Sequence, residues 1–409
     1  MVYNKGVLVR KILVFFYIVF LILVLSFPRI LWELKVLFLF PLILFGGFRL
    51  FYGDKLKAHA LYFILFYFLF YLWFGLVGLA KGNNISAILD EFRLQIFFPM
   101  FFLLFTFAQD SFDRQLSNFH NAVLMSCLVI FLSFLYLFLS FFLGFYIPSY
   151  FIQEFQMIMG VHTNYIQVNM ESVGMLFFIM PYLITHILIK NEKSPILEFL
   201  ALIIVIICAL LSGRRALWIC LLVSPFISLI LIKLTGLRER FGLWSYSFVI
   251  VVGLIFLSYL IVEKGILDYV VGAFSSIDER TIQKPYLIDG FFNNLFIGSG
   301  IGGTLGYTRS ESYPWLFELT YHQRLFNYGL LGFVLFHAMI AIYSFFKLRY
   351  SSLAVNSVRT HFISIFSGIV ILLIGSYSNP YMGSFDFLFL MWLFFLYGCV
   401  GSRTNNVHK

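Results

Sequence analysis

Side chains that could do chemistry concentrate in one polar interruption, Glu263–Arg324, of an otherwise apolar sequence. The planar guanidinium group of arginine binds phosphate oxygens. Carboxylates and imidazoles can accept or donate protons, and the flat faces of aromatic side chains can stack on sugars. A chain that keeps its polar groups in one segment is expected to do its chemistry there. The candidates in this segment are Arg280, Arg309, Glu318, His322 and Arg324, interleaved with Tyr286, Tyr313 and Trp315.

A second candidate is the tight connection Ser212-Gly213-Arg214-Arg215 between two apolar segments. The planar guanidinium groups of Arg214 and Arg215 suit bidentate binding of phosphate oxygens. The alternative is that both arginines only extend to the membrane surface and mark the helix ends.

Two further polar segments carry weaker signals. Residues 148–171 are polar with little charge, which suits contacts to sugar hydroxyls, although an ordinary solvated loop would look the same. The acidic pair Asp90-Glu91, followed by Arg93, could orient an acceptor or a metal, but it follows the third apolar segment and not the first. A solvated loop with a local ion pair is the simpler interpretation.

The glycine cluster Gly298–Gly303 has the GxGxxG spacing of a dinucleotide site, but no βαβ unit surrounds it. We expect instead a backbone that needs positive φ or a close approach. The sequence also lacks a Walker motif, HExxH and DxD. No cofactor and no dedicated metal site are expected.

Composition determines the elements that must position these residues. The chain has 409 residues, of which 61% are hydrophobic and 11% charged, with 55 phenylalanines. Soluble domains average about 25% charged residues. The sequence therefore predicts an all-α polytopic integral membrane protein with about twelve spans. The spans are Ile12–Phe27, Val36–Tyr52, Leu61–Ala80, Leu94–Ala108, Ala122–Ile147, Ser172–Ile189, Ile196–Leu211, Ala216–Ile232, Leu243–Val262, Leu325–Phe346, His361–Tyr377 and Phe385–Val400.

The distribution of Lys and Arg predicts the orientation. With the N-terminus in the cytoplasm, 17 basic and 6 acidic residues fall inside, for a net +11. The outside then holds 11 basic and 13 acidic residues, for −2. Both termini are predicted to be cytoplasmic, and residues 148–171 and 263–324 are predicted to be external loops of a single transmembrane domain, 1–409. The net charge of +9 reflects topology, so no nucleic-acid partner is expected.

The four cysteines, Cys127, Cys208, Cys220 and Cys399, all lie in apolar spans, which predicts neither disulfides nor a cysteine metal site. No cleavable signal pattern and no internal repeat are visible.

Residues 212–332 resemble the external-loop region of O-antigen polymerases and ligases. The resemblance rests on Arg280, on Leu295-Phe296-Ile297-Gly298-Ser299-Gly300, on Glu318, and on Tyr328-Gly329-Leu330-Leu331-Gly332 entering a span. Ser212–Leu217 is similar to the SxRxAL turn of the same proteins. In that family a histidine (ligases) or an acid (many polymerases) precedes the GLLG by about eleven residues, and Glu318 holds this position here. The resemblance therefore favours the polymerase branch.

The resemblance implies a GT-C-like membrane glycosyltransferase in the bacterial inner membrane. It would join undecaprenyl-pyrophosphate-linked oligosaccharide repeats into O-antigen or a related polysaccharide, without metal or nucleotide. Arg214, Arg215 and Arg280 would stabilise the departing pyrophosphate, and Glu318 or His322 would act as general base. A chain-length regulator and a flippase in the same membrane are the implied partners.

Three alternatives remain. An O-antigen ligase would transfer the same donor to lipid A core and would use His322. A flippase or other transporter would carry ionisable residues deep in its helices, where the spans hold little beyond His186, His337 and Asp386. A non-catalytic membrane scaffold is the third.

Overall fold

The computed structural model describes residues 2–52, 55–107, 112–149, 152, 158–162, 165–189, 195–240, 279–309, 311, 313–351, 356–377, 381–397 and 400–401. Helices dominate this part of the chain. They are α1 (Val2–Ser26), α2 (Trp32–Phe51), α3 (Ala58–Ala80), α4 (Ile85–Phe92), the π-helix η1 (Arg93–Phe97), α5 (Phe98–Phe107), α6 (Phe112–Leu143), the 3₁₀ helix η2 (Glu171–Met175), α8 (Leu176–Leu188), α9 (Ile196–Leu211), α10 (Arg215–Thr235), α13 (Glu279–Asn293), α14 (Thr320–Ser351), α15 (Asn356–Gly375), the 3₁₀ helix η3 (Tyr381–Gly383) and α16 (Phe385–Leu396).

Eight helices of the described residues are long and apolar enough to cross a membrane, and α9 and α16 are shorter apolar helices. The prediction of a polytopic helical membrane protein is confirmed at this level. The span predicted at Leu243–Val262 lies outside the described residues. The span predicted at Leu94–Ala108 falls on η1 and α5, and the helical structure extends back through α4 to Ile85.

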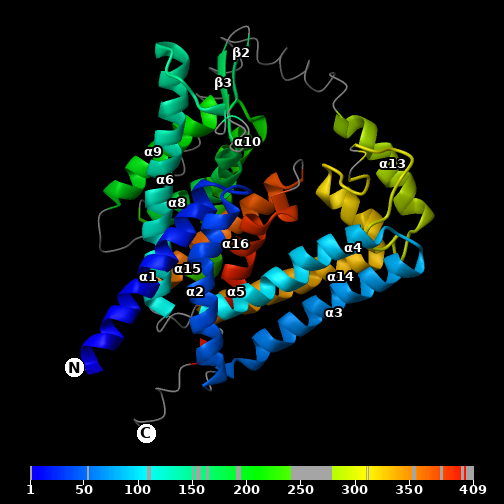
Figure 1. The fold of residues 1–409 in the computed structure, drawn as a ribbon, viewed down its shortest axis with the longest axis horizontal. Coiled ribbons are helices and arrows are strands. Elements are labelled where there is room, and N and C mark those ends of the chain that lie inside the picture. Colours follow the sequence, from blue (N-terminus) through cyan, green and yellow to red (C-terminus); the bar gives the residue numbers. More distant parts are fainter. Residues whose placement is uncertain are drawn as a thin grey trace.

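The helices form two groups joined by a central set (Figure 1). In the figure, α3, α14 and the stretch α4–η1–α5 run side by side at the lower right, with α13 above them. Helices α6, α8, α9, α10 and α15 pack together at the left. Helices α1, α2 and α16 connect the groups, with α2 and α16 both in contact with α5.

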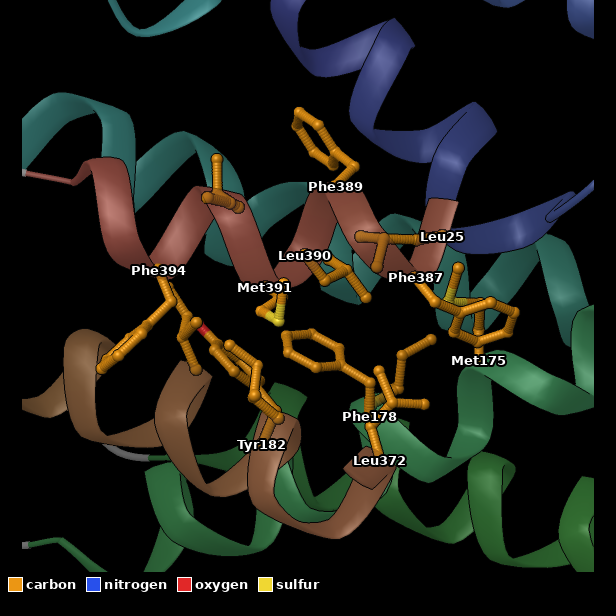
Figure 2. Close-up of a cluster of buried hydrophobic side chains, with 14 of the residues drawn as sticks. Leu25, Met175, Phe178, Tyr182, Leu372, Phe387, Phe389, Leu390, Met391 and Phe394 are labelled. Carbon is orange, nitrogen blue, oxygen red and sulfur yellow. The ribbon is translucent and has the colours of Figure 1, made fainter. Parts of the chain in front are cut away.

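The core is centred on α16 and α8, in which every residue is buried. A helix that is apolar on all sides belongs in the interior of a bundle. Figure 2 shows Leu390 and Met391 of α16 on the side of Phe178 of α8 and Leu372 of α15, with Phe389 on the opposite side of the helix. These central helices supply a rigid base for the loops at their ends.

Two short antiparallel strand pairs are the strands of the described residues. β1 (Lys55–Leu56) pairs with β4 (Val400–Gly401), and β2 (Ile158–His162) pairs with β3 (Tyr165–Asn169). The predicted external loop 148–171 therefore contains a β-hairpin, which a solvated-loop interpretation does not anticipate.

Contacts between distant segments agree with the predicted grouping of loops. The β1–β4 pair joins two segments assigned to the N-terminal side, and Ile189 bridges to Glu239 on that side. At the other end, Lys81 Nζ donates to Asn294 Oδ1 at 2.6 Å and to the Gly298 carbonyl at 2.7 Å. Segments predicted to share a side thus lie together.

The expectation that the spans hold little beyond His186, His337 and Asp386 is wrong. Lys35 of α2 is buried and forms an ion pair with Asp386, at 2.6 Å from Nζ to Oδ1. Three histidines and a glutamate meet in the other helix group. The buried Lys35 is tolerated because it pairs with Asp386, a contact that a hydropathy profile does not record.

Candidate functional site

A cavity of about 800 Å³ lies where the long polar loop meets the ends of the right-hand helices. Its wall includes the first residue of α2, the α4–η1–α5 stretch, the loop after Gly300, and the starts of α14 and α16. The lining residues are Arg29, Trp32, Ala87, Asp90, Glu91, Arg93, Leu94, Gln95, Phe98, Ile301, Gly302, Arg309, Tyr313, Trp315, Leu316, Phe317, Thr320, Gln323, Arg324, Asn327, Tyr328, Gly383, Ser384 and Phe385.

The charges of the cavity are predominantly positive. Four arginines line it against two carboxylates, Asp90 and Glu91. Arg93 Nη2 lies 3.2 Å from Asp90 Oδ1 within the cavity, whereas Arg29 and Arg309 contact Glu171 and Glu318, which are not lining residues. Guanidinium groups converging on a partly enclosed space favour an anionic ligand. The four are Arg29, Arg93, Arg309 and Arg324.

The acidic pair lies on a helix, so the prediction of a loop is wrong, whereas the predicted local ion pair is confirmed between Asp90 and Arg93. Asn84 caps α4 by accepting a hydrogen bond from the Ser86 backbone N–H at 2.8 Å. The chain then passes through the π-helix η1, whose wider turn rotates the side chains that follow it. Arg93 and Gln95 from this turn both line the cavity. Single π-helical turns inside α-helices often occur at functional sites.

Burial raises the pKa of Glu91, although Arg324 and a hydrogen bond from Gln95 oppose the shift. The guanidinium of Arg324 is itself only 8% exposed and lies 4.8 Å over the ring of Phe336. A glutamate with a raised pKa beside a buried cation is a suitable proton acceptor near neutral pH.

Glu318 is held between two arginines and is not among the lining residues. Its Oε2 lies 2.8 Å from Arg280 Nε, and its Oε1 lies 2.8 Å from Arg309 Nη2. Its backbone N–H donates to Gln283 Oε1 at 3.0 Å. Because α14 begins at Thr320, Glu318 lies outside the helix. The i,i+4 pairing with His322 would need a helix that starts earlier.

The other predicted residues divide between the cavity and its surroundings. Tyr313 and Trp315 line it and pack edge to face, with ring centroids 5.9 Å apart. Tyr286 instead stacks on Tyr307 at 5.8 Å, away from the lining set. The ring of His322 lies 5.9 Å from that of Tyr377, and its buried Nδ1 makes no hydrogen bond.

Arg214 and Arg215 are not among the lining residues, but Arg214 contacts a segment that reaches the cavity. Arg214 precedes α10 and donates from Nη1 to the Tyr381 hydroxyl at 2.9 Å. Burial raises the pKa of Tyr381, and Arg214 partly offsets the shift. Tyr381 begins η3, which ends at the lining residue Gly383. Arg215 is the first residue of α10, and its side chain is outside the described set.

The glycine cluster builds the cavity floor, and the expectation of positive φ is confirmed. Gly298, Gly300 and Gly302 have φ of 74°, 77° and 79°. A Cβ on Gly300 would lie 2.2 Å from the backbone N of Gly78, so the two backbones touch. No side chain larger than hydrogen fits this approach.

The same loop is hydrogen-bonded to a break in α14. Gly329 has φ 62° and ψ −176°, which interrupts the helix. The backbone N–H groups of Ser299 and Gly300 donate to the carbonyls of Phe326 and Asn327, both at 2.8 Å. The loop thus satisfies groups that the break would leave unpaired, as irregular backbone at membrane depth requires.

An apolar groove of about 670 Å³ adjoins the cavity. It is open, and Trp32 lines both spaces. The remaining lining residues come from α1 and α2. They are Phe16, Glu33, Val36, Leu37, Phe40 and Pro41.

Models of known protein families include none that matches this chain, and no curated protein matches it either. The functional assignment therefore depends on the residues and their geometry.

Sequence motifs supported a role for Asp90 and Glu91 only weakly and did not indicate Arg29 at all. A weak signal existed for the acidic pair, because Asp90, Glu91 and Arg93 place two carboxylates and a guanidinium group within four residues of sequence. Arg29 carries no motif, and only the fold brings it to Glu171, at 3.8 Å, and to the cavity.

Proposed function

We propose that the protein polymerises undecaprenyl-pyrophosphate-linked oligosaccharide repeats into O-antigen or a related surface polysaccharide. The observation that carries the proposal is the cavity, which combines four arginines, a partly buried glutamate and two aromatic faces. The reaction would take place on the external side of the bacterial inner membrane, with both termini cytoplasmic. A GT-C-like architecture goes with this proposal.

The donor has three chemically distinct parts, and each has a counterpart. The pyrophosphate is anionic and would bind Arg309 and Arg324. The sugars would stack on Tyr313 and Trp315. The polyprenyl chain would lie in the apolar groove, which meets the cavity at Trp32.

The chain's own residues would then carry out the transfer. Arginine forks would stabilise the charge that develops on the departing pyrophosphate. Glu91 would accept the proton from the acceptor hydroxyl, because its raised pKa brings its basicity closer to working pH. Glu318 would hold Arg309 and Arg280 in place through its two ion pairs. The competing hypothesis is that Glu318 itself acts as the general base, as the family resemblance implies.

The experiment is reconstitution of the purified protein with a lipid-linked repeat unit. Polymerisation gives a ladder of products that differ by one repeat. In cells, a strain that lacks the gene should carry single repeats capping the core. Complete absence of polymer from the core would instead mean a ligase, and the polymerase proposal would be abandoned.

A transporter of lipid-linked oligosaccharide is the second candidate. The observation that favours it is the set of ionisable groups inside the helix bundle, including Lys35 and Asp386. Reconstituted vesicles separate the two, since transport moves the substrate across the bilayer without changing its length.

A further inference from the structure

Four ionisable side chains meet in the left-hand helix group, away from the cavity. They are His120 near the start of α6, His186 near the end of α8, Glu198 near the start of α9 and His361 near the start of α15. Four separate helices thus place an imidazole or a carboxylate at one point.

The distances are those of a metal site. Glu198 Oε1 lies 3.3 Å from His120 Nε2 and 3.4 Å from His186 Nδ1. Two ligands bound tetrahedrally at the usual zinc distances of about 2.0–2.2 Å are about 3.3–3.5 Å apart. The ligand atoms of the three histidines lie within 4.8 Å of one another.

The environment leaves a ligand atom available. The side chains of His120, His186 and Glu198 are 12%, 8% and 13% exposed. His186 Nδ1 is buried and, despite its closeness to Glu198, forms no hydrogen bond. An unsatisfied buried nitrogen costs about 1–3 kcal/mol, which an ion would remove.

A second layer of contacts orients the imidazoles. The Tyr182 hydroxyl lies 3.1 Å from His120 Nδ1 and 3.4 Å from His361 Nδ1. A hydrogen bond at one ring nitrogen fixes which nitrogen is left to bind metal. The rings of His120 and His186 are stacked at 4.3 Å, so protonating both would place two like charges together. Neutral imidazoles are the form that binds metal.

We propose that His120, His186, Glu198 and His361 form a binding site for a divalent transition-metal ion, with Zn²⁺ as the best fit. Imidazole and carboxylate ligands suit zinc, and four protein ligands make a closed, structural site. The ion would clamp α6, α8, α9 and α15 together. Arg240, which interacts electrostatically with His186, opposes the cation, and the Glu198 carboxylate offsets it. This inference does not depend on the proposed enzymatic function.

The test uses full-length protein in detergent, freed of metal with a chelator and then titrated with Zn²⁺ or Co²⁺. We expect about one equivalent to be retained, visible absorption typical of tetrahedral Co²⁺, and a higher melting temperature with metal. Tyr182→Phe should weaken binding by about 10- to 100-fold, as removal of an outer-shell partner does. His186→Gln should weaken it further.

The matched control is His337→Gln, because His337 lies on α14 outside the cluster and its Nδ1 contacts the Phe333 carbonyl. This variant should bind metal as the wild type does. Failure of the wild-type protein to retain Zn²⁺ or Co²⁺ would overturn the proposal. Equal metal affinity in His186→Gln and the wild type would also overturn it. If His186→Gln does not fold, Tyr182→Phe still tests the proposal, because it keeps the aromatic ring and its packing, and unchanged metal affinity in Tyr182→Phe would contradict the proposed orientation of the imidazoles.

Discussion

Glu91 lines the cavity and Glu318 does not, and their surroundings predict different responses to the same substitution. Glu91 faces the cavity, whereas Glu318 contacts two arginines. Glu91→Gln should abolish polymer formation at unchanged membrane abundance, because no base remains. Glu318→Gln should retain part of the activity, because it removes the ion pair that positions Arg309 but leaves the proposed base in place. Product ladders from reconstituted protein measure both. Wild-type ladders from Glu91→Gln, with single repeats only from Glu318→Gln, would assign the base to Glu318.

The pH dependence follows from the raised pKa of Glu91. A base works only when deprotonated, so activity should fall as the pH is lowered through this raised pKa. The acidic limb of the rate profile should therefore lie above the ordinary glutamate pKa of about 4.3. Initial rates across a pH series check this. Glu91→Asp, which retains a carboxylate, should keep a limb of this kind, and a limb at or below the ordinary value would contradict the assignment.

Arg309 combines a cavity-facing charge with a contact to Glu318. Arg309→Ala should lower the transfer rate on the order of a hundredfold, the typical loss for one charge-stabilising contact. Arg309→Lys should recover little, since an ammonium cannot bind Glu318 and phosphate with one fork. Rates at saturating substrate give the comparison. Arg10→Lys, near the remote start of α1, is the control. An equal loss of transfer rate in Arg309→Lys and Arg10→Lys would show that the loss does not come from the position of Arg309 in the cavity.

At the scale of elements, the loop that carries the glycine cluster depends on contact with α3. Gly300→Ala should prevent the close approach to Gly78 and leave little folded protein or activity. Gly306→Ala is the matched control, because its nearest neighbour would be a Tyr286 ring carbon at 3.8 Å. Thermal melting in detergent compares the two. Equal melting temperatures would mean that the loop is not held as described.

The buried pair of Lys35 and Asp386 joins α2 to α16 beside the cavity. Lys35 Nζ also donates to the Phe27 carbonyl, and Asp386 Oδ2 accepts from the Arg29 backbone N–H, at 2.7 Å each. Asp386→Asn leaves a buried cation unpaired, which typically costs about 3–5 kcal/mol of unfolding free energy. Adding Lys35→Met should recover much of this loss. The unfolding free energy of both variants is measured in detergent. If the double variant is no more stable than Asp386→Asn, the unpaired buried charge is not the cause of the destabilisation.

At the scale of the whole molecule, the side assignment depends on the charge distribution and on the contacts that group the loops. A reporter fused at Arg403 should signal from the cytoplasm, and one fused at Ser310 from outside. A cytoplasmic signal at Ser310 would move the cavity to the wrong side for a lipid-linked donor.

Hydropathy and glycine pattern predict much of the fold. Most spans were found because a run of apolar residues is a local signal, and the positive φ at Gly298 and Gly300 followed from their spacing. The cavity was only partly predicted: Arg309, Tyr313, Trp315 and Arg324 were named and do line it. The residues missed, such as Arg29, reach the site only through packing of distant helices.

The histidine cluster was missed for the same reason. His120, His186, Glu198 and His361 lie on four helices, with no spacing between them that resembles a ligand motif. Convergence of this kind is a property of tertiary structure, so the spacing of residues along the sequence does not reveal it.

The attachment of the glycine loop to α3 has a consequence for biogenesis. Asn83 Nδ2 donates to the Ile301 carbonyl across 218 residues of sequence, and the Ile301 N–H donates to the Phe74 carbonyl. The first half of the chain therefore enters the bilayer with one wall of the cavity lacking its counterpart. This contact can form only after another 218 residues have been synthesised, so the cavity is completed late in the biogenesis of the protein.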